Sequence, residues 1–146
     1  MSQNYLTRLP SYILMVFSHL IKLNLRKNHL VTLPTFPKPC NLLRFLEFLD
    51  LGENKLRYIP TTFFLSIAKG ESRQEGPDLQ DNSAMSLAST NPVCSDQNSL
   101  KVLLLDNNCL ESIPAEIAEF ENLEILHLQN NKLAHIPASI FTIPGL

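Results

Sequence analysis

The chain of 146 residues is long enough for one domain with a sizeable core, and its 45% hydrophobic and 18% charged residues are ordinary for a globular protein. A net charge of −2 provides no field that would favour nucleic acid or an anionic membrane surface. The longest apolar run, residues 12–17, is far shorter than the roughly 20 residues that cross a bilayer, so we expect no membrane span.

The use of cysteine favours a reducing compartment. Cys40, Cys94 and Cys109 form no C-x-x-C pair, no even-numbered disulfide framework and no zinc spacing. The sequence also lacks an N-x-S/T glycosylation site and the charged start and cleavage site of a signal peptide. We therefore expect a cytoplasmic protein.

Apolar residues recur at fixed spacings from the start of the chain, which indicates an internal repeat. Residues 1–19 correspond to the second half of a unit, and full units start at residues 20 and 46. The recurring positions are Asn4, Leu6, Leu9, Pro10 and Ile13 in the half unit, Leu20, Leu23, Leu25, Asn28, Leu30, Leu33 and Pro34 in the first full unit, and Leu46, Leu49, Leu51, Asn54, Leu56, Ile59 and Pro60 in the second.

Residues 66–98 interrupt this repeat. Asn54 and Asn108 lie 54 residues apart, whereas only 26 separate Asn28 from Asn54. The intervening segment is rich in Ser, Asp, Gln, Gly and Pro, so we expect a disordered insertion within a single domain of residues 1–146. Neither end of the chain carries a polar capping unit, from which we expect either part of a longer repeat protein or a partner that covers the ends.

Two units at the end of the sequence give the repeat its clearest form. They start at Leu100 and Leu123, and Leu146 continues a period of 23 residues. Both units read L-x-x-L-x-L-x-x-N-x-L-x-x-I-P-x-x-I. The matching positions are Leu100, Leu103, Leu105, Asn108, Leu110, Ile113, Pro114 and Ile117, followed by Leu123, Leu126, Leu128, Asn131, Leu133, Ile136, Pro137 and Ile140.

This pattern resembles the leucine-rich repeat family in its intracellular 23-residue type, the group that includes Scribble, Erbin, the Ras-pathway scaffold repeats and the plant Ras-group-related repeats. The resemblance covers nearly all of the chain outside residues 66–98. It implies an α/β leucine-rich repeat solenoid of four full units, with a short parallel sheet on the concave side. It also implies a non-catalytic signalling scaffold or adaptor whose concave face holds a protein partner, such as a small GTPase or a phosphatase.

The spacing of each unit predicts which residues face the core. In L-x-x-L-x-L the alternating leucines point to one face of a strand, and the residues between them point to the other. After the strand, an asparagine amide can pair with two buried backbone groups at once. We expect this structural role for Asn28, Asn54, Asn108 and Asn131. The segments that lead back to the next strand differ: Pro34, Pro37 and Pro39 favour an extended course in the first unit, whereas residues 115–122 favour a helical turn or two.

Function should reside in the outward strand positions, which core packing does not explain. From the first unit to the fourth, these residues change from basic, through acidic, to apolar with a polar edge. Four apolar ones lie on adjacent strands, which is typical of an interaction site, although single outward apolar residues are also ordinary. The charges would orient the partner. The predicted partner-binding residues are Lys22, Asn24, Arg26, Phe48, Asp50, Glu53, Val102, Leu104, Asp106, Ile125, His127 and Gln129.

The sequence offers no motif for catalysis or for a cofactor. None of its four glycines lies in a phosphate-binding pattern. Cys109 and His127 occupy different repeat positions, so we do not expect them to form a nucleophile and base; the other histidines do not share a position either. We therefore expect neither enzyme activity nor a metal or cofactor. The alternative is the substrate-recognition part of a larger enzyme such as a ubiquitin ligase, whose catalytic domain would lie outside this sequence.

Overall fold

The computed structural model describes residues 4–17, 19–36, 43–68 and 98–146. Most of the predicted insertion, residues 69–97, lies outside the described residues, as do residues 37–42 of the return segment in the first unit. The disorder expected for the insertion, and the extended course expected for that return, remain predictions.

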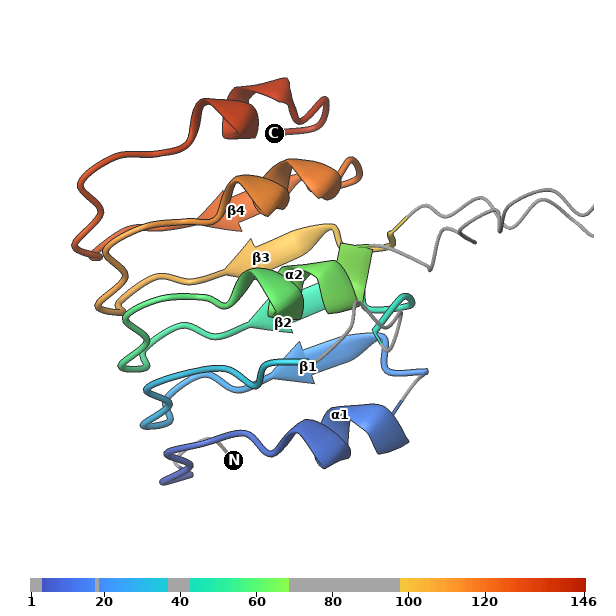
Figure 1. Ribbon diagram of the computed structural model, residues 1–146, viewed down its shortest axis with the longest axis vertical. Coiled ribbons are helices and arrows are strands. Elements are labelled where there is room, and N and C mark those ends of the chain that lie inside the picture. Colours follow the sequence, from blue (N-terminus) through green and yellow to red (C-terminus); the bar gives the residue numbers. More distant parts are fainter. Residues whose placement is uncertain (1–3, 18, 37–42, 69–97) are drawn as a thin grey trace, which may run out of the picture.

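Four short strands form one parallel sheet in chain order. They are β1 (Lys22–Asn24), β2 (Phe48–Asp50), β3 (Val102–Leu104) and β4 (Ile125–His127). Equivalent repeat positions lie opposite one another, so the first residues of the strands form the row Lys22, Phe48, Val102 and Ile125. Figure 1 shows the strands side by side, one in each successive unit. The parallel sheet expected from the repeat is thus confirmed.

The return segments carry short helices, which cover the face of the sheet that bears the inward leucines (Figure 1). The helices are α1 (Ser11–Val16), α2 (Thr61–Ala68) and two 3₁₀ helices, η1 (Ala115–Glu119) and η2 (Ala138–Thr142). Each begins directly after the proline of its unit, and the carbonyl of that proline accepts a hydrogen bond from the third residue after it. In α1, η1 and η2 this proline is the N-cap and has an extended backbone, and its missing N–H removes a donor that the helix would leave without a partner. The helical turn expected in residues 115–122 is confirmed.

Helix α2 corrects one boundary of the predicted insertion, which was placed three residues too early. Ser66, Ile67 and Ala68 belong to the last turn of α2 and are buried. The Ser66 hydroxyl donates to the Phe63 carbonyl at 2.6 Å, which satisfies a polar group that the apolar surroundings would otherwise leave unpaired. At the other end of the segment, Asn98 is also buried.

The core lies between the sheet and the return segments. Inward leucines of the middle units, such as Leu49 and Leu103, are fully buried, whereas Leu23 in β1 and Leu126 in β4 are only partly covered. Phe64 of α2 and Phe120, directly after η1, meet edge to face with ring centroids 5.1 Å apart. This contact joins the second and third units across the core, on either side of residues 69–97.

Candidate protein-binding face

The predicted asparagines form a ladder at the end of the strands. The Asn54 amide donates to the Leu25 and Leu51 carbonyls, both at 2.9 Å, and its oxygen accepts the Leu30 N–H at 3.1 Å. Asn108 and Asn131 repeat this arrangement one unit further along each time. Each of these asparagines therefore pairs with buried backbone groups, as predicted, and also links its own turn to the unit before it.

The residue before each ladder asparagine adopts a left-handed backbone. Lys27, Glu53, Asn107 and Asn130 have φ values of 58°, 52°, 54° and 56°. Such values are costly for most side chains and least so for asparagine. This turn directs the chain from the strand into the return, and it places the four side chains along one edge of the outward face.

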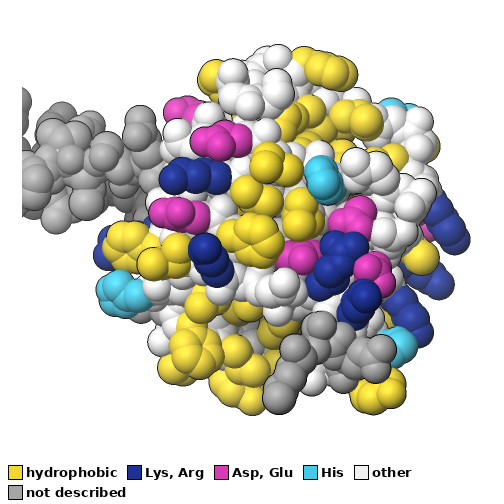
Figure 2. Space-filling model, turned by 180° about the vertical axis from the view of Figure 1, so that it is seen from behind, with side chains coloured by type: hydrophobic (Ala, Val, Ile, Leu, Met, Phe, Trp, Pro, Cys, Tyr) yellow, Lys and Arg dark blue, Asp and Glu magenta, His cyan; other side chains and the backbone are white. Residues whose placement is uncertain are grey.

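Four apolar side chains project from the outward face of the sheet. We call Phe48, Val102, Leu104 and Ile125 the apolar strip. The first three are partly exposed, and Ile125 is 44% exposed. Seen from this side, hydrophobic side chains gather in the middle of the face, and charged side chains lie on both sides of them (Figure 2). The strip is thus surface that the core does not use.

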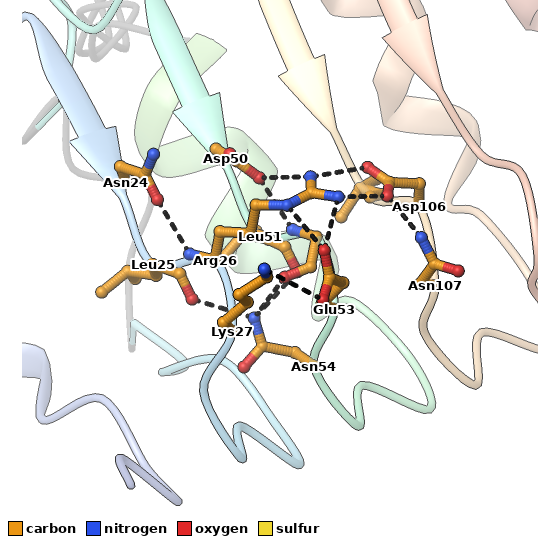
Figure 3. A network of polar contacts seen from close by, with 12 residues as sticks. Asn24, Leu25, Arg26, Lys27, Asp50, Leu51, Glu53, Asn54, Asp106 and Asn107 are labelled. Carbon is orange, nitrogen blue, oxygen red and sulfur yellow. Dashed lines mark hydrogen bonds and ion pairs between the residues drawn. The ribbon is translucent and has the colours of Figure 1, made fainter. Parts of the chain in front are cut away.

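On one side of the strip, a single guanidinium holds three carboxylates. We call Arg26, Asp50, Glu53 and Asp106 the Arg26 cluster. Arg26 Nη1 and Nη2 donate to the two Asp106 oxygens at 3.1 and 2.8 Å, and Nε donates to Glu53 Oε1 at 3.0 Å. Asp50 Oδ1 lies 3.5 Å from Nη1. Figure 3 shows the Arg26 side chain extended across the neighbouring strand to reach Asp106.

Gly52 makes this reach possible. A Cβ atom on Gly52 would lie 2.4 Å from Arg26 Nη1 and 2.8 Å from Asp106 Oδ1, well inside van der Waals contact. Gly52 does not have a positive φ, so its backbone does not require glycine. The glycine is instead needed for space. Its N–H also donates to Asp50 Oδ1 at 2.9 Å, which orients that carboxylate towards the guanidinium.

The cluster shifts the titration of its members. Hydrogen bonds from Arg26 hold the pKa of Asp106 below its usual range, because they favour the charged carboxylate. Reciprocally, the hydrogen bond to Asp106 raises the pKa of Arg26 above that of a free guanidinium. Both groups are therefore charged at neutral pH, and the side chain of Asp106 is only 11% exposed.

Polar contacts continue from the cluster along the edge of the sheet. The Asn107 amide donates to Asp106 Oδ2 at 2.6 Å, and the Asn130 amide donates to Asn107 Oδ1 at 2.9 Å. At the other end, Lys27 Nζ lies 3.9 Å from Glu53 Oε2. These contacts join all four units along one edge.

The other side of the strip carries a more exposed belt of charge. Lys101 Nζ lies 3.7 Å from Glu47 Oε2, and both side chains are about half exposed, at 50% and 45%. Lys22 and Glu124 flank this pair on β1 and just before β4, and both are exposed. Because these side chains face solvent, the pair contributes little to stability.

The twelve predicted partner-binding residues lie on or beside this face, but they are not equally available. Asp50 and Asp106 are buried beneath Arg26, although the sequence placed them outward. The basic residues of the first unit and the acidic residues of the second do not form separate patches, because Arg26 crosses the sheet and pairs with Asp50, Glu53 and Asp106. Binding by the twelve residues remains a prediction. Gly52 was not among the predicted residues, although Arg26, Gly52 and Asp106 share one repeat position.

Other kinds of site are not evident in the part of the chain that the structure describes. Those residues contain no group of three or more His, Cys, Asp or Glu side chains arranged to hold a metal ion. They also contain no helix with the length and apolar character needed to cross a membrane.

Comparison with known proteins identifies the repeat. The family model for the leucine-rich repeat matches residues 99–120 and 122–143. No curated protein matches the chain. A solved leucine-rich repeat protein from Leptospira interrogans is similar at 24% identity and a TM-score of 0.44, over 98% of this chain and 39% of that one. This chain therefore spans well under half the length of that protein. The leucine-rich repeat model thus covers the third and fourth units of this chain.

Proposed function

We propose that the chain is a protein-binding module that holds a protein partner on the outward face of its sheet. The observation that carries this proposal is the apolar strip, which spans three adjacent strands and remains partly exposed while the neighbouring charges pair with one another. Contiguous apolar surface of this kind tends to mark interaction sites. Leucine-rich repeats generally mediate protein–protein interaction, which supports the same function.

The size of the face fits a single protein contact. Four parallel strands at about 4.8 Å spacing give a face roughly 20 Å wide once the side chains at its edges are included. A standard interface uses about 800 Å² on each partner, so one partner would occupy most of this face.

The finer assignment follows from the resemblance of the repeats. We propose a solenoid of the intracellular 23-residue type, with the sheet on its concave side, acting in the cytoplasm as a signalling scaffold or adaptor. A small GTPase or a phosphatase is the kind of partner that this group suggests. The in-register rows across the sheet support the solenoid, because each unit repeats the geometry of the one before it.

The experiment compares partner capture by three forms of the chain. The wild type, the double variant Val102→Ser/Leu104→Ser and the control Phe141→Ser would each be used for affinity purification, and the recovered partner would then be titrated by calorimetry. Phe141 is a suitable control because its side chain is 82% exposed and lies in η2, away from the sheet. Circular dichroism would first establish that all three are folded.

We expect the double variant to bind the recovered partner at least about tenfold more weakly, which corresponds to roughly 1.4 kcal/mol. The control should bind as the wild type does. Equal binding by the double variant and the wild type would show that the partner does not use this face, and the proposal would then fail.

A further inference from the structure

We infer that the occupant of the apolar strip is an amphipathic α-helix of the partner, which lies across the strands and contacts the strip through uncharged aliphatic or aromatic side chains. The inference rests on the proposed function and specifies the chemistry of the partner. It is drawn from the geometry of the strip, from the pairing of the strands below it and from the distribution of free charge around it.

The spacing of the strip suits a helix. Phe48, Val102 and Ile125 lie opposite one another on three neighbouring strands, so they form a row perpendicular to the strand direction. Neighbouring strands are about 4.8 Å apart, and one helical turn rises about 5.4 Å. Side chains at i, i+4 and i+7 of a helix laid along the row would therefore each meet one strand. Leu104 widens the strip beside Val102, on the side of the Arg26 cluster.

The backbone beneath Phe48, Val102 and Leu104 cannot accept an added strand. β2 and β3 each pair with a neighbour on both sides, so their backbone groups are already hydrogen-bonded within the sheet. An extended peptide gains affinity chiefly through such main-chain hydrogen bonds at a free sheet edge. On this face a partner can contact only side chains, which is how an amphipathic helix binds.

The charges beside the middle of the strip are already paired. Arg26 holds Asp106, Glu53 and Asp50 on one side. Lys101 pairs with Glu47 on the other side. A charged side chain of the partner placed over the strip would lose its hydration and find no free opposite charge, which is unfavourable. The contacting stripe of the helix should therefore be uncharged.

Two charges at opposite ends of the row remain free. Within residues 4–17, 19–36, 43–68 and 98–146, neither Lys22 nor Glu124 lies within 4.0 Å of an oppositely charged group. Lys22 begins the row on β1, and Glu124 lies next to its last member, Ile125. A helix carries partial positive charge at its N-terminus and partial negative charge at its C-terminus. The helix should therefore lie with its N-terminus over Glu124 and its C-terminus over Lys22.

A displayed library of unconstrained random peptides, each about 20 residues long and so able to form several helical turns, provides the test. The library would be selected on the full wild-type chain. Recovered peptides would be synthesised, examined by circular dichroism in the bound and free states, and titrated at about 50 and 500 mM NaCl, a range over which exposed charge pairs become strongly screened. The same titrations would use Leu104→Ser, Ile125→Ser, the charge-reversed Lys22→Glu/Glu124→Lys and the control Phe141→Ser, each with its melting curve.

The inference predicts peptides that become helical on binding and carry apolar residues at i, i+4 and i+7. Their affinity should change less than about threefold between the two salt concentrations and fall at least about tenfold for Leu104→Ser and for Ile125→Ser. Charge reversal should weaken binding by about threefold, the size of an interaction with a helix end. Phe141→Ser should have no effect.

Two contrary outcomes separate this inference from the proposed function. Peptides that depend on Leu104 and Ile125, yet bind without helix formation or lose most of their affinity at high salt, would overturn the helix and keep the binding face. An unchanged affinity after charge reversal would overturn the orientation of the helix. Recovery only of peptides that bind wild type, Leu104→Ser and Ile125→Ser equally, or of none, would overturn both the inference and the proposed function.

Discussion

Arg26 and Asp106 form two hydrogen bonds, at 3.1 and 2.8 Å, although they lie 80 residues apart in the sequence. The contact runs from the first unit to the third and passes over Gly52 in the second. It therefore links the two parts of the sheet that residues 69–97 separate in the chain. The Arg26 side chain is 29% exposed, so its partial hydration limits both the cost of desolvation and the strength of the pair.

Gly52→Ala should destabilise the protein by about 1 kcal/mol or less, because the added methyl group would overlap the guanidinium and force it from Asp106, and this pair is partly exposed. Urea unfolding followed by circular dichroism would measure the change. The matched control is Gly52→Ala in an Arg26→Met background, where the cost should disappear because the clash with Nη1 is absent. An equal cost in both backgrounds would mean that Gly52 has another role.

Lowering the pH should weaken the fold through Asp106. Since its pKa is lower in the folded state than in the unfolded state, the carboxylate contributes stability above its unfolded pKa of about 3.9 and loses that contribution as the pH falls further. Urea midpoints measured from about pH 7 to pH 2.5 should therefore converge for wild type and Asp106→Asn at the acidic end. A constant difference between the two over the whole range would contradict the role given to Arg26.

The two neighbours Leu103 and Leu104 should respond differently to truncation. Leu103 is fully buried, and Leu103→Ala should cost about 2 to 5 kcal/mol through lost burial and the cavity left behind. Leu104 is partly exposed on the outward face, and Leu104→Ala should cost about 1 kcal/mol or less. Both values come from urea unfolding at equilibrium. Similar costs for the two variants would mean that the assignment of inward and outward residues in β3 is wrong by one position.

Removal of a ladder asparagine should cost more inside the stack than at the last unit. Asn108→Ala would leave the Leu56 N–H without a partner in a buried turn, at about 1 to 3 kcal/mol for the unpaired group, whereas the Leu51 carbonyl would still accept from Asn54. Asn131 is only partly buried, so water can replace some of its contacts and Asn131→Ala should cost about half as much. Thermal unfolding of the two variants under one condition tests the order.

Lys27→Asn should raise stability by about 0.5 to 1 kcal/mol, since asparagine tolerates the left-handed backbone at this position better than lysine. The equivalent positions of the third and fourth units already carry Asn107 and Asn130. The contact between Lys27 and Glu53, at 3.9 Å and largely exposed, contributes little that would be lost. A lower urea midpoint for Lys27→Asn would show that the lysine contributes more than its backbone conformation indicates.

The strands and the structural role of the asparagines were predictable because they depend on spacing within each unit. Leu103 and Leu105 alternate with Val102 and Leu104, and this alternation decides the inward and outward faces without knowledge of any neighbour. In the same way, Asn108 follows its strand at the fixed distance that every unit repeats. Both features depend on contacts within one unit or between adjacent units, which the repeated spacing specifies.

The Arg26 cluster was not predicted because it depends on the length of the Arg26 side chain and on the lack of a side chain at Gly52. Arg26, Gly52 and Asp106 occupy one row, and only the missing Cβ of Gly52 lets the guanidinium reach the third unit. A comparison of residues at equivalent repeat positions would have indicated the pair of Arg26 and Asp106, because an arginine, a glycine and an aspartate follow one another there. The start of the predicted insertion was misplaced for a related reason: Ser66 resembled the polar segment that follows, but it lies in α2 and its hydroxyl donates within the helix.

The equal register of β2 and β3 has a consequence for how this chain can change in length. Asn54 and Asn108 are 54 residues apart, yet their strands pair as neighbours at equivalent positions, as those of consecutive units do. We therefore expect that chain can be gained or lost between the buried residues Ala68 and Asn98 without a shift in the strands on either side. We expect a foreign domain or an affinity tag inserted between them to leave the sheet intact, which makes this position suitable for engineering a second function.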